Sequence, residues 1–208
     1  PEVGLFTTVR GPFTYDGRQY FVCYDPDSYD PDSAAGSLYL LHGLGSSGCD
    51  FIDRYHPSRF VQEAMQRGYL VILPESRDQK GACRYETDTG PFRGEESTDW
   101  DEIDLEYLDN LHEDAIITAY PALAGAPIYA AGMSAGAGVA PGFAQGRYAS
   151  DFAAVAVFSN NASAIQGLGS APYEVPTFFT YGENDNSTKD LTLAIEALED
   201  GDVPWAFE

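Results

Sequence analysis

The chain has 208 residues, 44% of them apolar and 13% aromatic, and it carries 33 acidic against 11 basic residues, a formal net charge of −22. This length and apolar content predict one globular domain over 1–208 and argue against a disordered chain. So acidic a surface repels nucleic acid and anionic membranes, and neither is an expected partner. Because salt screens the self-repulsion of such a surface, we expect adaptation to a saline environment; an ordinary solvated acidic surface is the alternative.

The sequence holds no run of about 20 apolar residues of the kind that crosses a bilayer. Its first residues, 1–4, have neither the basic nor the apolar region of a signal peptide, so we expect no targeting segment there. Of the three cysteines, Cys49 and Cys83 each follow a predicted strand, where they can pair. A disulfide would indicate an oxidising, extracellular compartment; three unlinked thiols in a cytosolic protein are the alternative.

The N-terminal part of the chain predicts a hairpin. Residues 5–24 alternate apolar and polar around Gly11-Pro12 and Asp16-Gly17, which indicates antiparallel strands near 5–10 and 19–24. The Asp/Pro-rich segment 25–32 favours a solvated turn. Its carboxylates also suit calcium, but the segment lacks the glycine and the terminal glutamate of the known calcium loop.

Beyond this hairpin, strands and helices alternate. Apolar runs predict buried strands at 37–41, 69–73, 127–131, 152–158, 177–181 and 203–207, and helical spacing predicts helices at 57–67, 99–119, 135–145 and 191–198. The long polar connection 75–98 is typical of a substrate-facing loop. This order favours an α/β fold with a mostly parallel sheet, antiparallel N-terminal strands, helices on both faces, and ligands at the carboxyl ends of the strands.

A serine between two glycines follows the strand at 127–131. The pattern Gly132-Met133-Ser134-Ala135-Gly136 is that of a nucleophile elbow, a strand-to-helix turn so tight that the serine is strained and its neighbours must lack bulky side chains. Gly-x-Ser-x-Gly also arises by chance in a chain rich in both residues, so its context has to support it. Other polar residues that follow predicted strands are expected at the same sheet edge: His42, Glu75, Ser159 and Asp185.

A nucleophilic serine needs an oxyanion hole, a base, and a carboxylate that orients the base. The backbone N–H groups of Leu44, in the turn after His42-Gly43, and of Ala135 are expected to face the developing oxyanion. Asp185, which follows the strand at 177–181, is the expected carboxylate, and Glu183 is a second candidate.

With these residues in place, the chain resembles the polyhydroxybutyrate depolymerase and feruloyl esterase family of α/β hydrolases. The resemblance runs from about Tyr15 to the end and rests on Tyr15-Asp16-Gly17-Arg18, Leu41-His42-Gly43, Ile72-Leu73-Pro74-Glu75, the elbow, and Tyr148 to Val157. It implies the α/β-hydrolase fold and a serine esterase acting on small-molecule or polymeric esters, of polyester or aromatic feruloyl type, without cofactor or metal. It also implies a disulfide between Cys49 and Cys83, although Arg84-Tyr85 departs from the usual tryptophan-bearing loop.

The base is the missing member of the triad. In this fold the histidine follows the acid, whereas no histidine follows Asp185, and His42, His56 and His112 are expected to be structural or packing residues. One explanation is a chain cut within 203–208, before the last loop and helix, so that the catalytic histidine lies beyond residue 208. The other is a true end, which would make the protein a catalytically inactive relative that binds ligands. We favour the first, since an uncovered apolar sheet face promotes aggregation.

A dinucleotide-binding module is a minor alternative. Residues 43–48 form a G-x-G-x-x-G pattern after a strand, and Glu75 ends the next strand. That motif should open the first strand-helix unit, however, with the helix beginning inside it. Here antiparallel strands come first, and a polar segment containing Pro57 intervenes.

Overall fold

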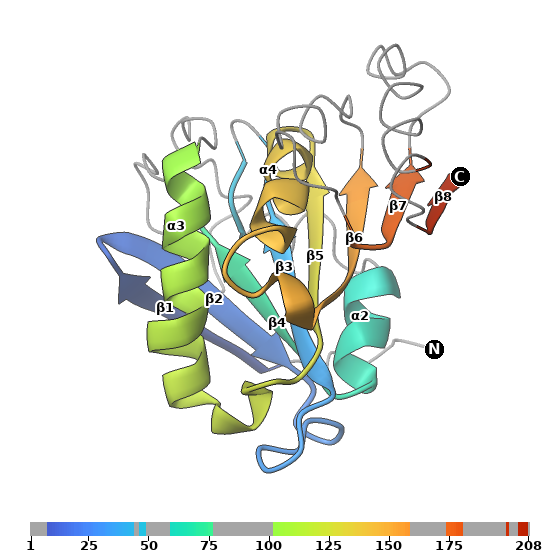
Figure 1. Ribbon diagram of the computed structural model, residues 1–208. Coiled ribbons are helices and arrows are strands. Elements are labelled where there is room, and N and C mark those ends of the chain that lie inside the picture. Colours follow the sequence, from blue (N-terminus) through green and yellow to red (C-terminus); the bar gives the residue numbers. More distant parts are fainter. Residues whose placement is uncertain are drawn as a thin grey trace.

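The computed structural model describes residues 8–43, 46–48, 59–76, 102–158, 174–180, 199 and 204–207. The strands in these ranges form one mixed eight-stranded sheet in the order β1-β2-β4-β3-β5-β6-β7-β8 (Figure 1). They are β1 (Thr8–Tyr15), β2 (Arg18–Tyr24), β3 (Gly36–Leu41), β4 (Tyr69–Pro74), β5 (Ile128–Met133), β6 (Phe152–Phe158), β7 (Thr177–Thr180) and β8 (Trp205–Phe207). The expected α/β architecture with a mostly parallel sheet is confirmed.

The opening hairpin is antiparallel, as predicted, and β2 also pairs antiparallel with β4. Asp16 and Gly17 make its turn with φ of 48° and 74°, values that aspartate and glycine accept more readily than other residues. The first strand is longer than predicted. It continues through Gly11-Pro12 as a bulge, with a register shift between Arg10 and Phe13.

The strands from β3 onward pair in parallel with one another. Alternate residues of the central strands face opposite sides of the sheet and build two cores. On β3, Tyr39 and Leu41 belong to one core and Leu38 and Leu40 to the other. Every residue of β3 is buried, which explains why the run 37–41 shows no polar alternation.

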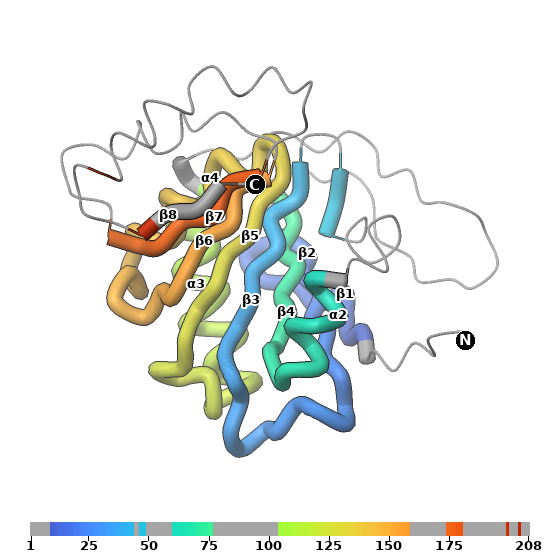
Figure 2. Tube along the Cα trace, turned by 90° about the vertical axis from the view of Figure 1, so that its right-hand side faces the viewer, coloured from blue at the N-terminus to red at the C-terminus, as the bar shows by residue number. Residues whose placement is uncertain are grey.

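The helices cover both faces of the sheet. Helix α2 (Arg59–Gln66) contributes Met65 to one core, while α3 (Glu102–Asn110) and α4 (Ala135–Ala144) pack on the opposite face (Figure 2). Helix α4 is rich in alanine and glycine, which allows its backbone to approach the sheet closely. In the described ranges, no helix is both long and apolar enough to cross a membrane.

Helix α3 continues directly into the π-helical segment η1 (Leu111–Ile117), where the sequence predicts one regular helix over 99–119. Leu111, His112 and Ile116 are the buried residues of this segment. The wider turn brings Leu111 and Ile116, five positions apart, onto the same buried face, which explains the departure from α-helical spacing. Short 3₁₀ turns follow at η2 (Pro121–Leu123) and η3 (Ala149–Asp151).

A buried ion pair links α3 to β2. Arg18 of β2 pairs with Asp104 of α3, whose side chain is fully buried. The guanidinium carbon of Arg18 lies 4.0 Å from the centre of the Tyr107 ring, an additional cation–π contact. Removing one partner would leave the other charge buried and uncompensated.

The Asp/Pro-rich segment forms turns closed by its own side chains. The Asp25 carboxylate accepts hydrogen bonds from the Asp27 amide at 3.0 Å and the Ser28 hydroxyl at 2.9 Å, and Asp30 accepts one from the Asp32 amide at 2.9 Å. Among the residues that the structure describes, no group of three or more histidine, cysteine, aspartate or glutamate side chains is arranged to hold a metal ion.

Candidate active site

Ser134 lies in the turn between β5 and α4, at the carboxyl end of the parallel sheet (Figure 1). Its φ and ψ are 53° and −116°, a strained conformation for a residue with a side chain. The residue is exposed, and it makes no side-chain cap for α4. Its amide donates to the Phe158 carbonyl at 2.9 Å, and its carbonyl accepts from Gly138 at 3.2 Å, so backbone bonds on both sides hold the turn.

The two flanking glycines are required by close backbone contacts. A Cβ atom at Gly132 would lie 2.2 Å from the carbonyl oxygen of Gly136, and one at Gly136 would lie 2.2 Å from the carbonyl oxygen of Leu41. No side chain fits at either position without moving the backbone. The Gly-x-Ser-x-Gly pattern is therefore a real elbow in this fold, with β3, β5 and α4 in backbone contact around Ser134.

The turn after β3 packs directly against the elbow. A Cβ atom at Gly43 would lie 3.3 Å from Ser134 Cβ and 3.2 Å from the Met133 carbonyl oxygen. The Ala135 amide occupies the first position of α4, where N–H groups have no partner within the helix. It is thus placed beside Ser134, while Leu44, the other predicted donor, lies outside the described residues.

His42 and Glu75 follow the neighbouring parallel strands β3 and β4, and both are fully buried. His42 Nδ1 lies 2.9 Å from the Gly43 carbonyl oxygen, and the Ser76 amide donates to His42 Nε2 at 3.1 Å. A glutamate oxygen accepts from the Gly48 amide at 3.0 Å. The expected structural role of His42 is confirmed, and the sheet edge collects His42, Glu75 and Ser134 as predicted.

The role of Glu75 was not predicted from the sequence beyond its place at the strand end. Its partner Gly48 is 27 positions away, but the order of β4 beside β3 brings the two together. The same contact argues against dinucleotide binding, since Glu75 faces the backbone of the glycine-rich turn instead of a ribose.

His112 is a packing residue beside the core to which Tyr39 belongs. Its ring is buried and edge-on to Tyr148 at 4.7 Å, and the Tyr39 hydroxyl lies 2.7 Å from its Nδ1. Burial disfavours the charged imidazolium and lowers the pKa of His112 from 6.5 to about 4. Neither of the two histidines that the structure describes is therefore placed to serve Ser134 as a base.

Several predicted site residues lie outside the described residues, namely Asp185, Glu183, Ser159, Cys49, Cys83 and His56. The triad acid and the disulfide therefore stay predictions. Cys23 is described as a free, buried thiol. Burial raises its pKa to about 12, so this cysteine is chemically inert in the folded protein.

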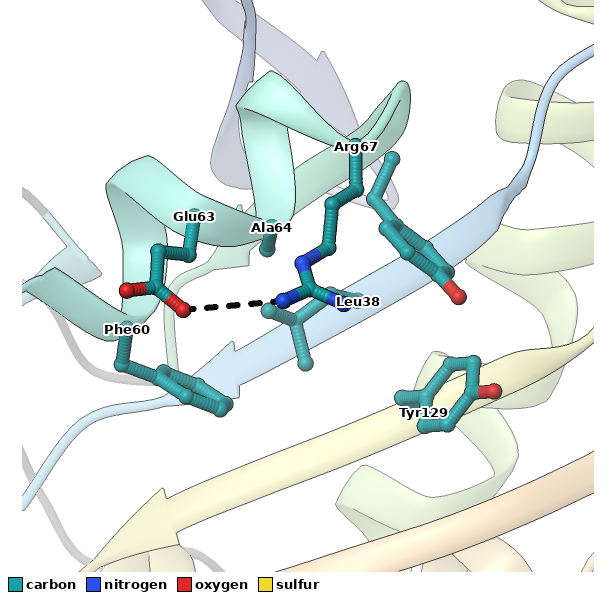
Figure 3. Close-up of a pocket in the computed structure, with 7 residues that line it drawn as sticks. Leu38, Phe60, Glu63, Ala64, Arg67 and Tyr129 are labelled. Carbon is teal, nitrogen blue, oxygen red and sulfur yellow. Dashed lines mark ion pairs between the residues drawn. The ribbon is translucent and has the colours of Figure 1, made fainter.

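A separate pocket of about 270 Å³ lies between α2 and the sheet (Figure 3). Leu38 and Tyr129 line it from the strands, and Glu63 of α2 pairs at 3.9 Å with Arg67, the residue that follows the helix. These strand residues lie near the amino ends of β3 and β5, whereas Ser134 follows the carboxyl end of β5. The pocket is not part of the candidate site.

The sheet order, the helices on both faces and the elbow after β5 together define the α/β-hydrolase fold. No family model matches the sequence, and no curated protein matches it. Among solved structures the chain is similar to a ferulic acid esterase, with 18% identity and a TM-score of 0.65 over 97% of this chain and 88% of the other.

Two further solved structures have the same fold. A carboxylesterase from Bacillus cereus shares 17% identity at a TM-score of 0.61, over 93% of this chain and 84% of its own. An S-formylglutathione hydrolase from Agrobacterium tumefaciens shares 12% identity at a TM-score of 0.63, over 97% and 85%. The likeness establishes the fold of this protein as that of α/β hydrolases with esterase members.

Proposed function

We propose that the protein is a serine esterase that hydrolyses carboxylic esters through a Ser-His-Asp triad. Ser134 is the nucleophile, Asp185 orients the base, and the base is a histidine outside residues 1–208. The amides of Leu44 and Ala135 form the oxyanion hole. The observation that carries this proposal is the strained, exposed conformation of Ser134 between two glycines whose positions admit no side chain.

The proposed reaction has two steps. Ser134 Oγ attacks the ester carbonyl carbon and passes its proton to the base, and the two amides bind the oxygen that becomes negative. Collapse of this intermediate breaks the bond to the alcohol, which leaves with the proton held by the base. Water then attacks the acyl-serine, and the acid and free Ser134 are released.

Neutral esters of polyester or feruloyl type are the proposed substrates. The names of the similar structures, a ferulic acid esterase and a carboxylesterase, support an ester, and the family resemblance supports these two types. The formal net charge of −22 disfavours anionic substrates, because the field around the protein repels them. We also propose a Cys49–Cys83 disulfide and an extracellular, saline setting, because an oxidising compartment allows the disulfide and salt screens the negative charge.

A catalytically inactive binding protein is the second candidate. It is favoured by the engagement of both described histidines in structural contacts, with His42 bound to Gly43 and Ser76 and His112 to Tyr39. On this reading, the elbow would persist as part of a ligand site without a base beside it.

The test compares Ser134→Ala with the parent, both as the complete gene product, on a short-chain nitrophenyl ester. Serine hydrolysis predicts a loss of about a thousandfold or more in kcat. Ser150→Ala is the matched control, since Ser150 is also exposed but lies in a turn before β6. After treatment with a fluorophosphonate, mass spectrometry should find the added mass only on the peptide that contains Ser134. Equal rates for Ser134→Ala and the parent would exclude Ser134 as nucleophile, and an inactive parent that binds the ester would favour the binding protein.

A further inference from the structure

The turn that follows β3 begins at Gly43, beside Ser134, and reaches Gly48 beside Glu75. Gly48 is held firmly at this second point. Its amide donates to Glu75 Oε1 at 3.0 Å, and a Cβ atom in its place would lie 3.0 Å from the Leu73 side chain and 3.1 Å from the Leu73 carbonyl oxygen. The glycine therefore rests on the end of β4, with a buried carboxylate as its acceptor.

The first end of the turn is held by His42. Because the Ser76 amide hydrogen points at His42 Nε2, this nitrogen is an acceptor and the proton is on Nδ1, which donates to the Gly43 carbonyl oxygen at 2.9 Å. The imidazole is then neutral. Glu75 Oε2 lies 3.4 Å from Nε2, and in this tautomer the approach is a close packing contact and not an ion pair.

Both ends of the turn are thus tied to one pair of buried side chains that follow adjacent strands. His42 and Glu75 are each fully buried, so solvent cannot replace either of them as a partner for the turn. Glu75 is itself fixed to a third strand, since its amide donates to the Gln19 carbonyl of β2 at 3.0 Å. Gly43 and Gly48, the described ends of the turn, are therefore tied to β2, β3 and β4 together.

We infer that Glu75 is a positioning residue for ester hydrolysis: by holding Gly48, it helps to fix Gly43, at the other end of the turn, in its place beside Ser134. This inference rests on the proposed function. A Cβ atom at Gly43 would lie 3.3 Å from Ser134 Cβ, so a shift of Gly43 also shifts the amide bonded to it, which is the proposed oxyanion donor. In this role Glu75 acts through the turn.

The expected effect falls on kcat and not on KM. Loss of one oxyanion donor costs about 10²–10³-fold in kcat, and a displaced donor should cost less, about 10–100-fold. Glu75→Ala removes the acceptor for Gly48. Glu75→Gln keeps an oxygen that can accept from the Gly48 amide, so it should recover most of the parent kcat.

The experiment measures kcat, KM and melting temperature for Glu75→Ala, Glu75→Gln and the parent, with Asp104→Asn as control. Asp104 is an equally buried carboxylate, but it serves Arg18, so Asp104→Asn should lower the melting temperature and leave kcat unchanged below it. A trifluoromethyl ketone, which forms an anionic adduct on a nucleophilic serine, adds a second readout. Its inhibition constant should rise in Glu75→Ala by the same factor by which kcat falls.

If Glu75→Ala does not fold, Glu75→Asp replaces it. Aspartate keeps the negative charge, but its side chain is one methylene shorter, so its carboxylate lies farther from Gly48. An unchanged kcat in the folded variant overturns the inference. A kcat that falls as far in Glu75→Gln as in Glu75→Ala also overturns it. If Ser134→Ala is as active as the parent, the proposed function itself has failed. If Ser134→Ala is inactive and Glu75→Ala is fully active, only the role of Glu75 is refuted.

Discussion

The close contact at Gly136 makes a sharp prediction for Gly136→Ala. The new Cβ atom would stand 2.2 Å from the Leu41 carbonyl oxygen, 2.5 Å from its carbon and 2.6 Å from the His42 carbonyl oxygen. All three atoms belong to the backbone, so no flexible side chain can move aside. Relief requires α4 to withdraw from β3 by about 1 Å, which places the cost at the upper end of overpacking, about 3 kcal/mol.

For a domain of this size, that cost lowers the melting temperature by roughly 6–12 °C. Because Ser134 immediately precedes α4, the same movement displaces Ser134, the proposed nucleophile, and a displacement of about 1 Å costs about 10²-fold in kcat. Thermal unfolding followed by circular dichroism and ester hydrolysis well below the transition measure the two effects separately.

Gly125→Ala is the matched control. Gly125 has a φ of 73° and nothing within 4 Å of an added Cβ, so alanine there brings backbone strain of about 1 kcal/mol and no clash. Gly136→Ala should therefore be much the less stable of the two. If it melts within about 2 °C of the parent and keeps its activity, the contact between α4 and β3 does not hold the elbow in the way argued from the structure.

Four other outcomes are expected. Gly43→Ala, whose Cβ would lie 3.3 Å from Ser134 Cβ, should lower kcat while changing the melting temperature little. His112 has a pKa of 6.5 unfolded and about 4 folded, so its contribution to stability is complete above pH 6.5 and falls by about 3 kcal/mol towards pH 4; denaturant titrations should show a weaker pH dependence for His112→Phe. If the proposed Cys49–Cys83 disulfide is present, a thiol reagent should label no cysteine in the folded protein and only Cys23 after unfolding without reductant. All three cysteines should be labelled after unfolding and reduction, and labelling of all three before reduction would exclude the disulfide. Raising NaCl should raise the melting temperature, because the net charge of −22 repels itself most at low ionic strength; a falling melting temperature would argue against halophilic adaptation.

Features with short-range causes were predictable from the sequence. The elbow at Ser134 is specified by two glycines within two positions of it, and the buried strand β3 by an uninterrupted apolar run. The turn at Asp16-Gly17 follows from residues that tolerate positive φ. In each of these cases, the residues that determine the structure are adjacent in the chain.

Contacts between distant residues were not predictable in the same way. The Glu75 bond to Gly48 and the Arg18 pair with Asp104 depend on the strand order, which places β4 between β2 and β3. No local pattern encodes that order. The π-helical segment also escaped prediction, since Leu111 and Ile116 share a face only when the turn is wider than the 3.6-residue period that the prediction assumes.

The bulge in β1 bears on how the protein behaves in concentrated solution. Within the part of the sheet that the structure describes, β1 is an edge strand, and an edge with regular, unpaired N–H and C=O groups is a template on which another chain can add a strand. Here the register shifts between Arg10 and Phe13, and Pro12 has no N–H to donate. A second chain could not continue a regular hydrogen-bond ladder past this point. The bulge in β1 therefore disfavours aggregation of the protein through this edge of the sheet.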